Sequence, residues 1–237
     1  MSRFDDQPIF RTGGTLSAID EGLRAFMLRV YSFMALGLGL TGVVAYIVAS
    51  NPQLMHAVHG SGLSLLFMLA PIGVVMFLSI RMNKIEAATA QMLFWVFAAL
   101  MGISLSVVFA VYQEASIAQM FFVTASVFGS MSLYGYTTKK DLTSMGSFMI
   151  MGLWGIILAS LVNLFMQSSA MQLMLSVLTV IVFTGLTAYD TQRIKEVYAD
   201  SDSLDTASKK AVFGALMLYM DFINIFLSLL RLFGVRK

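Results

Sequence analysis

Seven long runs of apolar residues that carry almost no charge dominate this sequence. A helix needs about 20 such residues to cross the hydrocarbon core of a bilayer, and helices are favoured there because the backbone must satisfy its own hydrogen bonds. The runs are Val30–Ala49, Leu63–Ile80, Thr89–Tyr112, Ile117–Thr138, Met145–Met166, Met171–Tyr189 and Ala211–Leu230. We therefore predict an all-α integral membrane protein with seven transmembrane helices. Residues 30–237 form its transmembrane domain, and residues 1–29 form a cytoplasmic tail or interfacial segment.

The composition supports a membrane protein and excludes several other classes. Only 12% of the residues are charged and 58% are hydrophobic, whereas a soluble domain carries roughly 25% charged residues. The net charge of +2 is small and scattered, so we expect no nucleic-acid partner. The chain has no cysteine, which excludes disulfides and thiolate metal sites.

Lysine and arginine alternate along the predicted loops. The N-terminal tail has four of these residues, and the six following loops have none, two, none, two, none and four. Because cytoplasmic loops are enriched in these residues, we predict a cytoplasmic N-terminus. Seven crossings would place Arg231, Arg236 and Lys237 outside, against this rule. Either a short basic tail is tolerated there or the last segment dips in and returns; we favour seven crossings.

Two aspartates lie in or at the edge of the apolar runs. Asp221 is near the middle of the last run, between Tyr219 and Asn224, and Asp190 follows Tyr189 at the end of the sixth. An ionised group in the membrane costs at least ~2.5 kcal/mol, and such residues usually mark ion or proton paths. Alternatively, Asp221 is kept neutral by hydrogen bonds to Tyr or Asn, and Asp190 is solvated or caps a helix. We predict a functional pair, with Tyr189, Tyr219 and Asn224 as supporting polar residues.

The predicted boundaries do not by themselves bring the two acids together. Asp190 would lie near the cytoplasmic face, whereas Asp221 lies ten residues past Ala211, roughly 15 Å into the membrane. The two become level only if the sixth helix extends past Asp190 or the seventh begins earlier. Spacing therefore permits the pair without requiring it.

Other polar residues define the remaining candidates. Arg81 ends the second run, where it either anchors the helix at the membrane surface or pairs with Asp190 at the same depth. Glu114 lies in an outer loop and is either solvated or attracts cations at a pore mouth. His56 and His59 are three residues apart, but no third ligand lies near them in the sequence.

The sequence lacks the residues that several classes of membrane enzyme need. The sequence has no HExxH motif for a metalloprotease, and both histidines lie in one outer loop, which leaves no base for a serine nucleophile in the membrane. Neither Asp190 nor Asp221 lies in the GxGD context of intramembrane aspartyl proteases, and no run contains a lysine for a retinal Schiff base. We therefore expect neither an enzyme nor a bound cofactor.

Four sequence stretches resemble one known family. TGLTAYDTQRIKEVY and LYMDFINIFLSLLRLFG, supported by FLSIRMNK and YGYTTKKDL, are similar to motifs of the Bax inhibitor (transmembrane Bax inhibitor motif) family, and the resemblance covers roughly residues 20–237. It implies seven helices with the last surrounded by the other six, and a pH-sensitive calcium leak. By motif, Asp190 and Asp221 match the family's di-aspartyl pH sensor, and Arg81 matches the arginine that latches it. The short loops suggest a bacterial inner membrane.

The chemistry of two acids fits this resemblance. Two carboxylates a few ångströms apart in low dielectric cannot both ionise cheaply, so they share a proton. Their hard oxygen atoms also suit Ca²⁺, which makes Asp190 and Asp221 candidate calcium ligands. We predict a gate in which Arg81 clamps the ionised acid and protonation loosens the last helix. The alternatives are a proton-coupled cation exchanger, or a non-transporting protein that modulates other membrane proteins while the acids only hold helices together.

Overall fold

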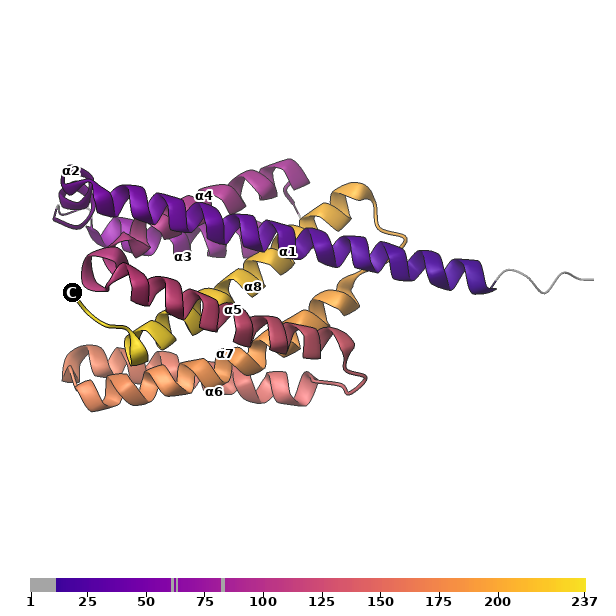
Figure 1. Ribbon diagram of the computed structural model, residues 1–237. Helices are drawn as coiled ribbons and strands as arrows, with labels where there is room; N and C mark the ends of the chain where they lie inside the picture. Colours follow the sequence, from indigo (N-terminus) through magenta and orange to yellow (C-terminus); the bar gives the residue numbers. More distant parts are fainter. Residues whose placement is uncertain (1–11, 61, 63, 82–83) are drawn as a thin grey trace, which may run out of the picture.

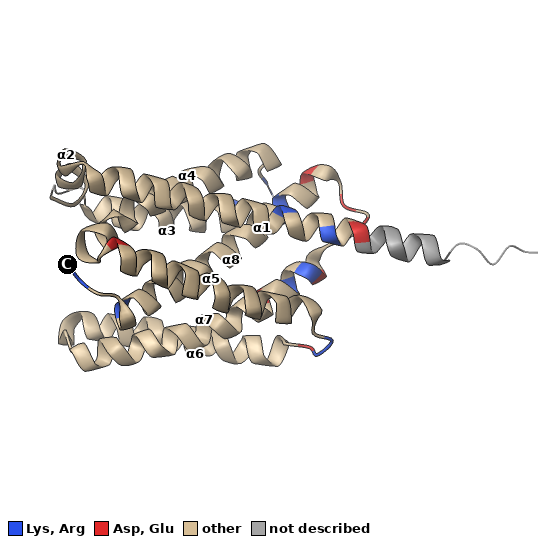
Figure 2. Cartoon of the chain, viewed as in Figure 1, with Lys and Arg blue, Asp and Glu red and all other residues tan. Residues whose placement is uncertain are grey.

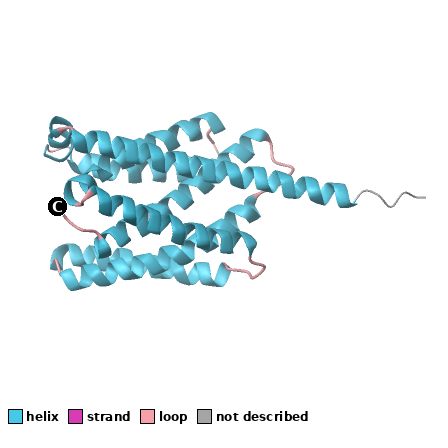
Figure 3. Cartoon of the chain, in the orientation of Figure 1, coloured by secondary structure: helices cyan, strands magenta, loops and turns pink. Residues whose placement is uncertain are grey.

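The computed structural model describes residues 12–60, 62, 64–81 and 84–237, with side chains from Glu21 onward. The described chain forms helices, short connections and one isolated bridge (Figures 1 and 3). The helices are α1 (Thr12–Ser50), α2 (Pro52–Met55), the π-helical turn η1 (His56–Gly60), α3 (Ser64–Arg81), α4 (Ala87–Val111), α5 (Glu114–Thr137), α6 (Thr143–Met166), α7 (Ser169–Val197) and α8 (Leu204–Phe233). Within the described residues, seven helices are long and apolar enough to cross a membrane, as predicted.

The first membrane helix begins earlier than its apolar run. The segment long and apolar enough to span a membrane starts at Glu21, and Phe26 and Met27 lie in the core of the bundle. Arg24 and Arg29 interrupt the apolar run in the sequence, but both are exposed on the outer face of the same helix. The predicted boundary at residue 29 is therefore wrong for residues 21–29, which belong to the bundle. The predicted tail over residues 1–11 lies outside the described part of the chain.

The last helix occupies the centre of the bundle, as predicted. In Figure 1, α8 runs obliquely between α1 on one side and α7 on the other, and it packs on α1, α4, α5 and α7. The other two membrane helices lie further out, because α6 packs on α7 and α3 packs on α4. The helix that carries Asp221 is thus the most buried of the candidate spans.

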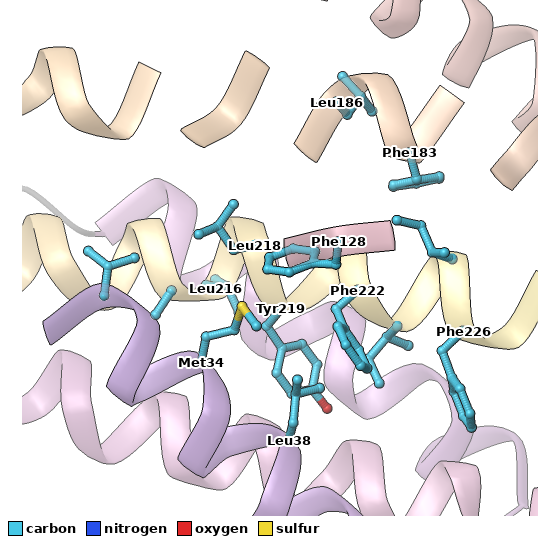
Figure 4. Close-up of a cluster of buried hydrophobic side chains, with 14 of the residues drawn as sticks. Met34, Leu38, Phe128, Phe183, Leu186, Leu216, Leu218, Tyr219, Phe222 and Phe226 are labelled. Atoms are coloured by element: carbon cyan, nitrogen blue, oxygen red, sulfur yellow. The ribbon is translucent and has the colours of Figure 1, made fainter. Parts of the chain in front are cut away.

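Aromatic side chains fix α8 in this position. Tyr219 is fully buried, in a cluster of hydrophobic side chains that also holds Met34 and Phe222 (Figure 4). Its ring packs edge-on against Phe94 and Phe97, with ring centroids 6.4 and 5.1 Å away. Its hydroxyl group bonds the Thr41 hydroxyl at 2.7 Å, and Thr41 in turn donates to the Ala98 carbonyl at 2.8 Å. One buried chain of hydrogen bonds therefore joins α8, α1 and α4.

Most of the charged residues gather at one end of the bundle, and only a few lie at the opposite end (Figure 2). We call this the basic end; it comprises the start of α1 and the connections α3–α4, α5–α6 and α7–α8. At the opposite end, the backbone of the C-terminal segment pairs with the α4–α5 connection, through Lys237 to the Val111 carbonyl at 2.9 Å and Gln113 to the Val235 carbonyl at 3.0 Å. Helix α8 therefore passes through the whole bundle, and the dip-and-return alternative is wrong.

Candidate functional site

The two membrane acids meet because both of their helices are longer than the apolar runs. Helix α7 continues to Val197, seven residues beyond Asp190, and α8 begins at Leu204, seven residues before Ala211. Ser203 caps the start of α8 by accepting a hydrogen bond from the Thr206 backbone N–H at 3.2 Å. From the sequence, the two acids become level if the sixth membrane helix extends past Asp190 or if the seventh begins earlier. In the structure both are true.

The side chains of Asp190 and Asp221 lie close enough to form a hydrogen bond with each other. Asp221 is 3% exposed, and Asp190 is half-buried beside it. An ionised carboxylate can only accept hydrogen bonds, so a bond between two carboxyl groups requires a proton on one of them. The arrangement is therefore one that can hold a single shared proton.

One oxygen atom of the pair has no protein partner. Within the described residues, the buried Oδ2 of Asp221 makes no hydrogen bond, although buried polar atoms are rarely left unpaired. This atom can receive a proton or coordinate a cation without breaking an existing protein contact. It is the feature that most clearly separates the acid pair from a purely structural hydrogen bond.

Close helix contacts hold α7 around the pair. Gly135 of α5 lies against the Ala188 backbone, and Gly146 of α6 lies against the ring of Tyr189, with no room for a Cβ atom at either glycine. On the other side of Asp190, the Thr191 hydroxyl lies 3.0 Å from the Ser132 hydroxyl of α5. Asp190 is thus held on a helix segment whose neighbours leave little freedom.

The supporting residues predicted from the sequence lie elsewhere. The Tyr219 hydroxyl bonds Thr41, and Asn224 donates to the Met220 carbonyl of its own helix at 2.8 Å. Neither contact involves Asp221, whose partner is Asp190. The alternative in which Tyr or Asn keeps Asp221 neutral is therefore not what the structure shows.

The structure does not bring Arg81 to the acid pair. Arg81 is exposed in the last turn of α3, and its side chain forms no ion pair with a described residue. The physical reason is that α3 packs on α4, away from α7. The cation that interacts with Asp190 is instead Arg193, one turn further along α7. Arg193 lies three residues after Asp190 on the same helix, and this spacing could have identified the pair from the sequence.

Glu114 and His59, the candidate residues predicted in outer loops, also lie apart from the acid pair. Glu114 is exposed in the first turn of α5, at the end opposite the basic end. The His59 ring bonds the Ser106 hydroxyl at 2.8 Å. No group of three or more metal-ligand side chains exists among the described residues, so a calcium ion would need backbone, hydroxyl or water oxygens in addition to the two acids.

The fold and the site define a polytopic membrane protein with an acid pair between its central helix and α7. The model of the family described as "Inhibitor of apoptosis-promoting Bax1" matches residues 23–237. The chain therefore belongs to the Bax inhibitor-1 family, as its motifs indicated.

Several bacterial proteins are similar to this chain over nearly its whole length. The uncharacterized protein RP147 of Rickettsia prowazekii is 47% identical over 218 residues, which cover 92% of each chain. The inner membrane protein YbhL of Escherichia coli K12 is 46% identical over 219 residues, 91% of this chain and 94% of YbhL. The uncharacterized membrane protein SpyM3_0260 of Streptococcus pyogenes is 35% identical over 227 residues, 91% of this chain and 94% of the relative.

Proposed function

We propose that the protein is a pH-sensitive calcium leak channel gated by Asp190 and Asp221. The observation that carries this proposal is the close approach of two carboxyl groups on the central helix and its neighbour, one of them buried. A pair that shares one proton changes charge within the protein core when that proton leaves or a second one arrives. Membership of the family is consistent with a channel or transporter-like role.

In this mechanism, the protonation state of the acid pair decides whether Arg81 of α3 lies away from Asp190 or binds to it. While Asp190 shares a proton with Asp221, it has no need of Arg81, which is exposed in this structure. Loss of the proton leaves two carboxylates in low dielectric, where an added cation is strongly stabilising. Arg81 then moves to Asp190 and α3 closes the bundle. Acid therefore favours the leak.

Calcium competes with the proton at the same oxygen atoms. Ca²⁺ takes six to eight oxygen ligands, with carboxylates preferred, and the unpartnered Oδ2 of Asp221 is available to it. Calcium is thus the transported ion and a transient ligand of the pair, whereas a resident cofactor has no part in this mechanism. The basic end faces the cytoplasm of a bacterial cell, and the protein lies in the inner membrane, as the name of YbhL states for that relative.

The test is calcium entry into liposomes that contain the purified protein and an internal calcium dye. We expect entry that increases in acid for the wild-type protein and loses this pH dependence in Asp221→Asn. Asp141→Asn is the matched control, because Asp141 is an exposed aspartate in the α5–α6 connection. Opposing proton flux locked to calcium entry would identify an exchanger instead. No calcium entry at any pH would favour a protein that modulates other membrane proteins.

A further inference from the structure

A groove between α1 and α5 runs along the lipid-facing side of the bundle. Helix α1 packs on α4, α7 and α8, and α5 packs on α7 and α8, so α8 forms the floor between them. Three cavities of about 450, 530 and 320 Å³ follow one another along this groove. Phe128 lines both the first and the second, and Leu38 lines both the second and the third. These volumes are typical of sites for small organic molecules.

The groove is about as long as the hydrocarbon core of a bilayer is thick. Along α1 its lining residues extend from Arg24 to Ala45, which corresponds to about 31 Å of helix. The hydrocarbon core of a membrane is ~30 Å thick. The groove therefore follows the full depth that lipid chains occupy.

Glycine residues leave parts of the groove walls without side chains. Gly39 and Gly42 on α1 and Gly129 on α5 all line it, and a Cβ atom at any of them would meet no other atom within 4 Å. The floor at this depth is Phe222, whose ring lies 5.3 Å from Phe121 and 5.7 Å from Phe128. The interior of the groove is thus apolar and has room for a flexible chain.

The mouth of the groove at the basic end carries positive charge. Arg24 and Tyr136 line the first cavity on opposite walls. The Lys195 ammonium group lies 5.8 Å from the centre of the Tyr136 ring and donates to the Tyr136 carbonyl at 2.9 Å. Two acidic residues, Glu21 and Glu196, are near these cations in the sequence, but both are exposed and neither lines the cavity.

We propose that this groove binds one anionic phospholipid. Its phosphate lies between Arg24 and Lys195, and one acyl chain fills the first two cavities down to Phe222. The charge of the mouth fits a phosphate, the apolar interior fits a hydrocarbon chain, and the depth fits the membrane. Phe222 directly follows Asp221, so the bound chain also supports the segment of α8 that carries the acid pair.

The test is native mass spectrometry of the full-length protein in detergent, titrated with phosphatidylglycerol or with phosphatidylcholine of the same acyl chains. We expect one phosphatidylglycerol to be retained per chain, and more weakly bound phosphatidylcholine. Arg24→Gln should lower phosphatidylglycerol retention about fivefold, the effect of one basic residue near an anionic lipid. Lys84→Gln is the matched control, because Lys84 is an exposed lysine of the basic end that does not line the groove.

The acyl-chain part of the proposal has its own variant. Gly129→Leu fills the groove and should lower retention of both lipids, whereas Gly155→Leu, an equally open glycine on α6, should leave it unchanged. If Gly129→Leu does not fold, Gly39→Leu replaces it on the opposite wall. Equal retention of the two lipids by the wild type, or unchanged retention in the groove variants, overturns the proposal. A dimer without bound lipid would overturn it as well, and would assign the groove to a second copy.

Discussion

Gly135 of α5 lies so close to Ala188 of α7 that a Cβ atom at position 135 would overlap the Ala188 carbonyl oxygen. This contact sits two residues before Asp190, so it sets how closely α5 approaches the segment that carries the acid. Because backbone atoms cannot move aside as a flexible side chain can, Gly135→Ala should separate the two helices. We expect a loss of about 1–3 kcal/mol of stability, as for other overpacked sites.

Thermal unfolding of the purified protein in detergent measures this loss. Gly129→Ala is the control on the same helix, because a Cβ atom there would meet no other atom within 4 Å. Equal melting temperatures for Gly135→Ala and Gly129→Ala would show that α5 and α7 are not in close contact at this point.

The acid pair predicts a specific pattern among variants. Asp190→Asn and Asp221→Asn each remove the repulsion between two carboxylates, so each should flatten or shift the pH dependence of calcium leak. Because both changes break the same unit, the double variant should resemble either single variant rather than their sum. The measurement is calcium entry into liposomes across acid and alkaline pH. Wild-type leak and pH response in both single variants, with protein verified in the membrane, would falsify the gate.

Arg81 tests whether α3 takes part in gating. Arginine presents a planar fork of donors that lysine lacks, so Arg81→Lys should weaken the latch on Asp190 and raise basal leak at alkaline pH. Arg231→Lys is the control, since Arg231 is also exposed near a helix end but lies on the last turn of α8. A wild-type leak at every pH in Arg81→Lys would confine the gate to the acid pair and its neighbour Arg193.

The charge distribution predicts the orientation in the membrane. Because the connections of the basic end hold lysine and arginine, a reporter fused after Lys140 should read as cytoplasmic. A reporter after Ser169, at the start of α7, should read as external, and so should one after Lys237. A cytoplasmic reading at Ser169 would contradict the alternation of the helices, while a cytoplasmic reading at Lys237 alone would contradict the passage of α8 through the membrane.

Asp141 gives the bundle a small, pH-dependent contribution outside the membrane. Hydrogen bonds from the side chain and backbone of Thr143 hold the pKa of Asp141 below its ordinary value of 3.8. A lowered pKa stabilises the folded state at pH values above 3.8 and loses this effect as the pH falls through the folded pKa. Asp141→Ala should therefore lower the melting temperature slightly at neutral pH. The difference should vanish in strong acid; a constant difference would assign it to lost packing.

The helices and both acids could be predicted from the sequence. Lipid allows few structures for a long uncharged run and few roles for a charged residue inside one. The sequence underestimated helix length wherever polar residues continue a helix beyond its apolar run. Gln192 shows why: its amide group bonds the Leu142 backbone N–H and the Lys140 carbonyl at 2.8 Å each, so a polar residue is buried on an extended α7. Such partners come from other segments of the chain, and no local pattern reveals them. The groove depends on how α1 and α5 diverge, which the sequence does not encode locally.

The position of α8 also determines the order in which the molecule is built. A ribosome delivers this helix after the six other membrane helices described, yet it supplies the surface on which α1, α4, α5 and α7 pack. Until it arrives, the earlier helices have no completed interior, and the residues that will contact Tyr219 and Phe222 face lipid or one another. The packed interior of the bundle can therefore be completed only once α8 has entered the membrane.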